Sequence, residues 1–492
     1  MHLSSLVEMI ESGFADRVLL GDDQRRISGA AFASMSKAAG TTLTGRPSVV
    51  YVGENHPLLP IALFASAWAG APFVPVNYRL EDAHLNQLVD RQPGALVLAD
   101  AVSAPRITGD HEVVVLDDWL AAIDETVEVA DAPWDDDEVA VVLFTSGTTS
   151  EPKSALLRHR HLMAYLLGSV EFGSAGEDEA VLVSVPPYHV AGVANMLSNL
   201  FAGRRLVYLD HFTPQRWLEL VRSERVTNAM VVPTMLARVV AALDGAPADV
   251  PTLRTLSYGG AKLSERVLRE ALDVFADTGF VNAYGLTETA STIAVLGPDD
   301  HRAAVTSDDP QVQRRLASAG QVLPMVEIEI RDDNDNPVPP GQTGTIYLRG
   351  EQISGEYATG SLLDDQGWFC TRDRGYVDSG GYLFIEGRSD DTIIRGGENI
   401  APAEIEEVIA AIPWVDDVCV VGVTDDEWGQ EIAAAVVVKP GDQHTAEEIQ
   451  QAVRDNLRGS KTPRLVVFAD ELPRTDTGKL LRRVVKTDIF HD

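Results

Sequence analysis

The stretch Thr145-Ser-Gly-Thr-Thr-Ser-Glu-Pro-Lys153 is the most informative part of this 492-residue chain. It follows the apolar run Val139-Ala-Val-Val-Leu-Phe144, which predicts a buried strand. Five small hydroxyl residues surround one glycine and precede a lysine, and such a loop can turn amide and hydroxyl donors towards an anion. The spacing of a Walker A loop is absent. The stretch therefore predicts an anion-binding loop, with an ordinary polar turn as the alternative.

Short apolar segments alternate with helical segments on both sides of this loop. Strands are expected at 49–52, 73–76 and 95–98, with a helix capped by Asn55 between the first two and another at 81–90. The same alternation returns between residues 180 and 258. Because parallel strands need helical connections, this rhythm predicts an α/β fold with mostly parallel sheets covered by helices.

The pattern changes near residue 320. Residues 327–331 and 345–349 alternate polar and apolar side chains, which predicts antiparallel strands in a small β-barrel or sheet that closes the large domain. A polar link near 388 precedes a compact α+β unit with helices at 402–412 and 445–457. We therefore expect a large N-terminal domain at 1–388, a hinge at 389–391 and a small mobile C-terminal domain at 392–492.

Composition narrows the functional classes. The formal net charge of −34 argues against a general surface for nucleic acid or anionic membranes. Lysine is scarce, at 7 residues against 33 arginines, so a lysine inside a motif is informative. Two cysteines, Cys370 and Cys419, give no disulfide framework and no zinc pattern. No signal peptide is recognised, and prolines break the apolar run 58–76, so we expect a cytoplasmic protein without a membrane span.

The chain contains two further motifs, Tyr258-Gly-Gly-Ala261 and Asn282-Ala-Tyr-Gly-Leu-Thr-Glu-Thr-Ala290. Glycines let a flat base approach the backbone, and a carboxylate suits a hard cation. Together with the loop, they resemble the adenylate-forming superfamily, which includes acyl-CoA synthetases, peptide-synthetase adenylation domains and beetle luciferases. The resemblance implies that Tyr284 faces adenine, that Glu288 binds Mg²⁺, and that Thr287 lies near the α-phosphate and the acyl carboxylate.

The same resemblance implies that the domain at 1–388 binds ATP and the acyl group, and it assigns the remaining ATP contacts. Asp373 matches the aspartate that grips the ribose hydroxyls, Arg388 a second ribose contact, and Asp390 the hinge position. Lys479, in Arg474-Thr-Asp-Thr-Gly-Lys-Leu480, matches the mobile catalytic lysine that stabilises charge as the carboxylate attacks phosphorus. The expected catalytic residues are Lys479, Thr287, Glu288 and His189. The expected ATP contacts are Thr145, Ser146, Gly147, Thr148, Thr149, Lys153, Gly259, Gly260, Ala261, Asn282, Ala283, Tyr284, Gly285, Asp373 and Arg388.

Weaker patterns indicate which thiol accepts the acyl group and which carboxylic acid is activated. Residues 395–405 resemble the acyl-CoA synthetase version of the pantetheine channel. The implied CoA contacts are Gly396, Gly397, Glu398, Trp428, Lys461 and Arg464, with a surface tryptophan beside basic residues as the alternative. The implied acyl pocket is His189, Val190, Ala191, Ala283, Gly285 and Ala290. Small residues there favour a medium-chain or bulky apolar acid. Peptide-synthetase adenylation domains carry an aspartate in this region that pairs with an α-amino group. This chain has none there, which argues against an amino acid as the substrate.

Three positions depart from the family pattern. Ser150 and Arg372 stand where glycine is usual, and Arg395 stands where a small residue is usual. Arg395 either narrows the channel mouth or contacts a phosphate, and the sequence leaves both open. A homodimer is compatible with the sequence, which does not fix the assembly.

The resulting hypothesis is an AMP-forming acyl-CoA synthetase, an acid–thiol ligase that uses ATP, Mg²⁺ and coenzyme A, with fatty acid metabolism as its setting. Two alternatives remain: an acyl-AMP ligase that loads a carrier-protein phosphopantetheine, and a non-catalytic nucleotide-binding regulator. The intact polar residues Lys153, Glu288, Asp373 and Lys479 argue against the last.

Overall fold

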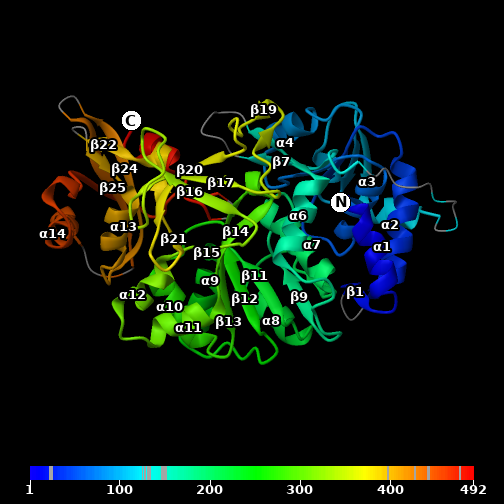
Figure 1. Cartoon of the computed structure of the whole chain (residues 1–492), viewed down its shortest axis with the longest axis horizontal. Helices are drawn as coiled ribbons and strands as arrows, with labels where there is room; N and C mark the ends of the chain where they lie inside the picture. Colours follow the sequence, from blue (N-terminus) through cyan, green and yellow to red (C-terminus); the bar gives the residue numbers. More distant parts are fainter. Residues whose placement is uncertain are drawn as a thin grey trace.

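The computed structural model describes residues 1–21, 26–124, 126, 129, 135–145, 152–395, 398–425, 428–439, 441, 444–475 and 478–492. Two large sheets and their helices build the N-terminal region, and a small α+β unit lies at one end of the longest axis (Figure 1). No helix in these described ranges is long and apolar enough to cross a bilayer. The apolar run 58–76 instead forms a buried helix and a buried strand.

The larger sheet has thirteen strands. In spatial order these are β16 (Glu327–Arg331), β17 (Gly344–Arg349), β20 (Phe369–Val377), β21 (Tyr382–Arg388), β15 (Gly320–Val322), β14 (Ser291–Leu296), β13 (Gly279–Leu286), β12 (Thr255–Gly259), β11 (Asn228–Val231), β9 (Ala180–Val183), β10 (Arg205–Tyr208), β1 (Val18–Gly21) and β2 (Arg26–Ser28). Strands β1, β10, β9, β11, β12 and β13 run parallel, whereas the strands from β14 to β16 pair antiparallel.

The second sheet has eight strands: β19 (Gly360–Ser361), β18 (Glu356–Tyr357), β8 (Lys153–Arg158), β7 (Val139–Thr145), β4 (Phe73–Val76), β3 (Val49–Val52), β5 (Leu96–Ala99) and β6 (Glu112–Val115). The helices of the N-terminal region are α1 (Ser4–Gly13), α2 (Gly29–Leu43), α3 (Leu59–Trp68), α4 (Asp82–Val89), α5 (Leu116–Ala121), α6 (His159–Ser169), α7 (Val190–Ala202), α8 (Pro214–Ser223), α9 (Pro233–Leu243), α10 (Glu265–Val274), α11 (Pro298–Thr306) and α12 (Pro310–Gln313).

The C-terminal unit has its own hydrophobic core. It contains β22 (Ile393–Arg395), β23 (Glu398–Ile400), β24 (Val415–Asp425), β25 (Gly429–Val438), β26 (Leu465–Phe468), α13 (Pro402–Ala410), α14 (Ala446–Asn456) and α15 (Arg482–Val484). One buried cluster draws every member from residues 393–453. Because this cluster is self-contained, we infer that the unit can move as a body.

The α/β fold with a smaller C-terminal unit confirms the prediction, and residues 49–52, 73–76 and 327–331 form strands with the predicted bounds. Two details differ. Asn55 does not cap α3, because Leu58 holds the cap position and the Asn55 amide donates to the Leu209 carbonyl. The antiparallel strands expected in a small barrel extend the large sheet, because β21 pairs with β15.

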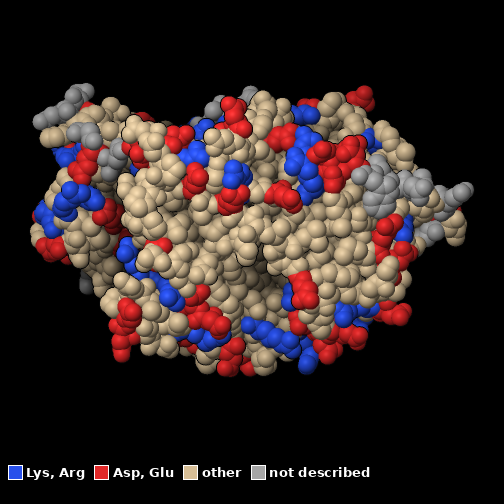
Figure 2. Space-filling model, in the orientation of Figure 1, with Lys and Arg blue, Asp and Glu red and all other residues tan. Residues whose placement is uncertain are grey.

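Charge is spread over the visible surface. On the face drawn in Figure 2, acidic and basic side chains lie interspersed, and the described atoms form no broad basic area. The hollow near the middle of that face is surrounded mainly by uncharged residues (Figure 2). This distribution agrees with the strongly negative net charge.

Candidate active site

The predicted site residues gather where the parallel strands of the large sheet end. Strand β12 ends at Gly259, which lies opposite Ala283 of β13. A side chain at Gly260 would meet nothing within 4 Å, so the space beside this backbone is open. Ligands of open α/β sheets bind at the carboxyl ends of the strands, so the location itself indicates a binding site.

Tyr284 and Arg388, both half-buried, form one polar group with the buried carboxylate of Asp373. The Tyr284 hydroxyl donates to Asp373 Oδ2 at 2.5 Å, and Arg388 Nε lies 3.4 Å from Asp373 Oδ1. Burial raises the pKa of Asp373, although Tyr284 and Arg388 both oppose this shift. Arg388 Nε is buried and makes no hydrogen bond within the described part of the chain. This unused donor beside a buried carboxylate fits a hydroxylated ligand such as ribose.

Tyr357 contacts both Glu288 and Lys153. Glu288 lies in the short 3-10 helix η2 (Thr287–Thr289) and accepts a hydrogen bond from the Tyr357 hydroxyl. Lys153, the first residue of β8, places its ammonium 5.7 Å from the centre of the Tyr357 ring. A magnesium ion typically uses one or two protein carboxylates and substrate phosphates, so Glu288 fits such an ion. The described residues hold no cluster of three or more metal-ligating side chains.

Backbone strain follows Glu288 directly. Ala290 has φ +52° and Ser291 has φ +114°, in a region that residues with side chains rarely adopt. The pairing of β13 with β14 also shifts its register nearby, between Tyr284 and Gly285, which pair with Ala294 and Thr292. Strain of this kind is maintained where surrounding packing imposes it and is common at functional sites.

Lys479 comes from the C-terminal unit but lies among the charges of the large domain. Its loop is closed by the Thr475 amide, which donates to the Lys479 carbonyl at 2.8 Å. Burial and then Arg388 lower the pKa of Lys479, whereas Asp373, Asp391 and Glu288 oppose the shift. The residue is nonetheless exposed to solvent. The structure therefore brings together the predicted ribose, metal and catalytic residues.

The lysine loop also touches the large domain sterically. Gly478 has φ +82°, and a Cβ there would lie 2.4 Å from Thr234 Cγ2, at the start of α9. A side chain at position 478 would therefore require the loop or Thr234 to shift. Thr234 thus marks the place where the lysine loop packs on the large domain.

One of the unusual arginines, Arg372 of β20, lies beside the predicted hinge. Arg372 has φ +61°, so this arginine adopts the backbone angle that the family's glycine would adopt without strain. Its Nη1 lies 3.8 Å from Oδ2 of Asp390, at the predicted hinge. Next to it, burial raises the pKa of Asp391, and Arg482 Nε lies 3.4 Å from this carboxylate.

Comparison with known proteins adds the family. The AMP-binding enzyme family matches residues 10–358, and its C-terminal domain matches residues 404–479. The chain is 33% identical to an indoleacetate–CoA ligase of Aromatoleum aromaticum, over 92% of this chain and 90% of the relative. It is 32% identical to the fatty acid–[acyl-carrier-protein] ligase ScoC of Streptomyces coeruleorubidus, over 93% and 89%.

This chain belongs to the AMP-binding enzyme family. The resemblance to the adenylate-forming superfamily is thereby confirmed. ATP-bound MatB from Rhodopseudomonas palustris has the same fold, with a TM-score of 0.85 and 26% identity over all of both chains. The AMP complex of MenE from Bacillus subtilis gives a TM-score of 0.83 and 25% identity over 98% of each chain.

In this AMP-binding enzyme, the predicted CoA residues lie on the C-terminal unit. Arg395 donates to Glu431 at 2.7 and 3.1 Å and stacks on Trp428 at 4.9 Å. Because its guanidinium is already bound, the structure disfavours Arg395 as a free phosphate contact. Trp428 remains 41% exposed.

The basic candidates near that tryptophan differ in their availability. Lys461 is ion-paired with Glu404, whereas Arg464 lies 3.6 Å from Asp425 and keeps most of its side chain exposed. Glu398 lies 3.2 Å from Arg458. Gly396 and Gly397 lie outside the described residues.

The predicted acyl residues of the AMP-binding enzyme lie at the start of α7 and on the segment from β13 to Ala290. His189 holds the N-cap position of this helix, and Val190 and Ala191 are half-buried in its first turn. Ala283 and Gly285 lie on β13, whereas Ala290 is fully buried in the hydrophobic core.

The two ends of the anion-binding loop are held by a hairpin, because Thr145 at the end of β7 pairs with Lys153. Ser146, Gly147, Thr148, Thr149 and Ser150 lie outside the described residues.

Three further predicted contacts have ordinary positions near the site. Asn282 donates from Nδ2 to the Ser318 carbonyl at 3.1 Å, Thr287 is half-buried, and Ala261 follows the end of β12. Sequence reasoning missed Tyr357 and Thr234, which touch Glu288 and the lysine loop. Neither residue stands in a recognisable motif, and only the tertiary contacts reveal them.

Proposed function

We propose that this AMP-binding enzyme is an ATP-dependent acyl-CoA synthetase. A carboxylate oxygen attacks the α-phosphorus of ATP, the bond to pyrophosphate breaks, and acyl-AMP forms. The thiol of CoA then attacks the acyl carbon, loses its proton, and releases AMP. The CoA ligases among the relatives support this assignment.

The observation that carries the proposal is the position of Lys479. A cation from the C-terminal unit lies among Asp373, Glu288 and Arg388 of the large domain. In this position the ammonium stabilises negative charge that develops between carboxylate and α-phosphate. Tyr284 and Asp373 would hold the nucleoside, and Glu288 would hold a magnesium ion that neutralises charge on the phosphates. Positioning and electrostatics supply most of the catalysis in phosphoryl transfer.

The second step needs a different arrangement of the C-terminal unit. The face that carries Trp428 and Arg464 is the predicted CoA surface, and the self-contained core of this unit allows it to rotate as a body. We propose that rotation about Asp390 withdraws Lys479 and presents this surface.

The test is acid-dependent exchange of labelled pyrophosphate into ATP, over a panel of carboxylic acids. Lys479→Ala is expected to abolish exchange while keeping thioester formation from supplied acyl-AMP. Lys486→Ala is the matched control, because Lys486 pairs with Asp492 at 2.8 Å and has no predicted role in the site. Equal loss of both steps in Lys479→Ala contradicts the two-state scheme, and exchange without any acid contradicts the assignment.

A second candidate acceptor is a carrier-protein phosphopantetheine. The match to ScoC, named as an acyl-carrier-protein ligase, favours keeping this alternative. Competition between free CoA and a loaded carrier for preformed acyl-AMP distinguishes them. Because Trp428 offers an exposed ring and Arg464 an exposed cation, we expect CoA to win.

A further inference from the structure

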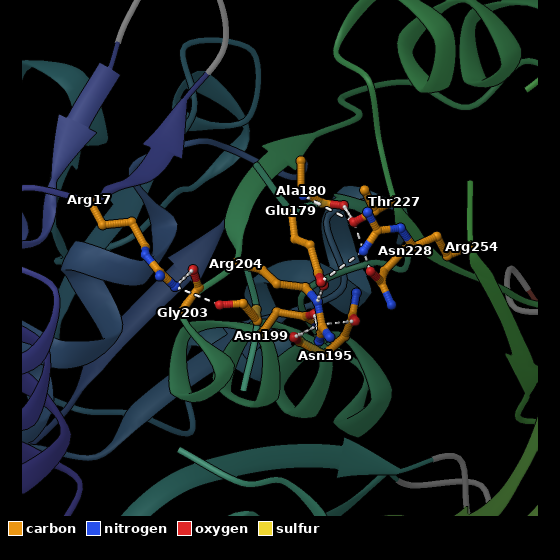
Figure 3. Close-up of polar contacts among 11 residues, drawn as sticks. Arg17, Glu179, Ala180, Asn195, Asn199, Gly203, Arg204, Thr227, Asn228 and Arg254 are labelled. Atoms are coloured by element: carbon orange, nitrogen blue, oxygen red, sulfur yellow. Dashed lines mark hydrogen bonds and ion pairs between the residues drawn. The ribbon is translucent and has the colours of Figure 1, made fainter. Parts of the chain in front are cut away.

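A chain of hydrogen bonds along α7 fixes the orientation of one side-chain amide. Arg204 donates from Nε to Glu179 at 2.8 Å and from Nη1 to Asn199 Oδ1 at 3.2 Å (Figure 3). Asn199 Nδ2 then donates to the Oδ1 of Asn195 at 2.8 Å. Arginine can only donate, so Asn199 must accept from it with its oxygen and donate with its nitrogen. The oxygen of Asn195 is therefore the atom that faces Asn199, and its nitrogen is turned away.

Asn195 Nδ2 is consequently a donor of fixed direction. It is buried from solvent and has no hydrogen-bond partner among the described residues. A buried donor without an acceptor is costly, and native proteins rarely keep one without a reason. The rest of the chain of contacts is satisfied: Asn199 is buried with both of its amide atoms bonded, and Glu179 also receives Arg254 at 3.2 Å (Figure 3).

The position on the helix points to the acyl site. Asn195 follows Ala191 by four residues, so the two side chains lie on the same face of α7, about 6 Å apart along its axis. Ala191 and His189 belong to the segment that the proposed function assigns to the acid. Both Ala191 and Asn195 are half-buried, whereas Gly192, Val193 and Met196 on other faces are buried. The helix also packs beside β14, which follows the strained Ala290.

We propose that Asn195 Nδ2 donates a hydrogen bond to an acceptor atom in the tail of the carboxylic acid. The preferred substrate is then an acid whose tail carries an oxygen acceptor, such as an ether, carbonyl or hydroxyl oxygen, roughly one helical turn deeper than Ala191. This inference rests on the proposed acyl-CoA synthetase activity. It refines the expectation of a purely apolar acid, because a hydrocarbon tail would cover the donor without satisfying it.

The direct test needs only the wild-type enzyme and matched pairs of acids. Each pair has one chain or ring skeleton, with a methylene in one acid and an ether oxygen in the other, and the oxygen is moved along the series. Acid-dependent pyrophosphate exchange gives kcat/KM for each acid. At one oxygen position, the ether acid is expected to be preferred by about tenfold or more, because a donor built for an acceptor rejects the analogue that lacks it.

Variants then assign the preference to the residue. Asn195→Leu keeps a similar volume and removes the donor, so the preference for the ether acid should disappear or reverse. Asn228→Leu is the control, because Asn228 starts β11 at the end of the strand opposite to the site. Asn195→Asp keeps the acceptor for Asn199 and removes the donor, which covers a failure of the leucine variant to fold.

Each outcome decides the matter. No preference in the wild-type enzyme at any oxygen position means that water or the protein satisfies the donor, and the proposal is wrong. A preference that survives in both Asn195 variants shows that another group donates to the ether oxygen, and it overturns the proposal as well. Absence of exchange with every acid instead contradicts the proposed function.

Discussion

Replacing Gly478 by alanine tests whether the lysine loop must dock on the large domain for the first half-reaction. The new Cβ would lie 2.4 Å from Thr234 Cγ2 and 2.7 Å from Oγ1, so either the docked loop or the Thr234 side chain must move. A change of this size costs about 1–3 kcal/mol by overpacking. The left-handed backbone at φ +82° adds about 1–2 kcal/mol for any residue with a side chain.

These two costs act differently on the two steps. The backbone cost belongs to the loop and is present wherever the loop keeps its conformation. The clash exists only when the loop lies against Thr234, so it selectively disfavours the docked state. By itself, the clash should lower pyrophosphate exchange by about 5- to 150-fold, with a smaller effect on thioester formation from supplied acyl-AMP.

Thr234→Ala provides the matched test. It removes the two atoms that the new methyl group would strike but leaves the backbone cost in place. Gly478→Ala combined with Thr234→Ala should therefore recover most of the clash component of the exchange rate. If the double variant is as slow as Gly478→Ala alone, or if both half-reactions fall equally in Gly478→Ala, the inferred docking of this loop is wrong.

Three further changes have definite expectations. Arg372→Gly relieves a strained backbone and loses only an exposed ion pair with Asp390, so denaturant unfolding should show a change between zero and about 1 kcal/mol of stabilisation; a clear destabilisation would contradict the strain argument. Burial lowers the pKa of the stacked His2 and His159 to about 4 and about 2. As pH falls below about 6.5, the two histidines are protonated in the unfolded chain before they are protonated in the folded protein. Each should therefore lower the free energy of unfolding by about 1.4 kcal/mol per pH unit below that value, which thermal unfolding at pH 7, 6 and 5 measures. A melting temperature that does not change with pH would refute this prediction. Arg395→Ser removes the guanidinium that stacks on the CoA-surface indole, so the KM for CoA should rise several-fold while pyrophosphate exchange stays unchanged; a parallel loss of exchange would place Arg395 in the first step.

The sequence was sufficient for the fold class because the signals were local. The apolar segments at 49–52 and 73–76 need no distant partner to be recognised as strands, and the change of pattern near residue 320 marks a real change from parallel to antiparallel pairing. The motif residues Tyr284, Asp373 and Lys479 could also be selected in this way, because each stands in a short pattern of fixed spacing.

Contacts between distant segments were decided only by the tertiary structure. Sequence spacing could not show that the Tyr284 hydroxyl bonds Asp373, that Tyr357 bonds Glu288, or that Gly478 meets Thr234. These pairs are joined by the packing of separate strands and units. Periodicity describes which face of one element is apolar, whereas the partner of that face depends on how the whole sheet is assembled. The same holds for Asn195, an unremarkable helical residue in the sequence, whose donor is oriented only by the hydrogen bonds that reach it from Arg204 through Asn199.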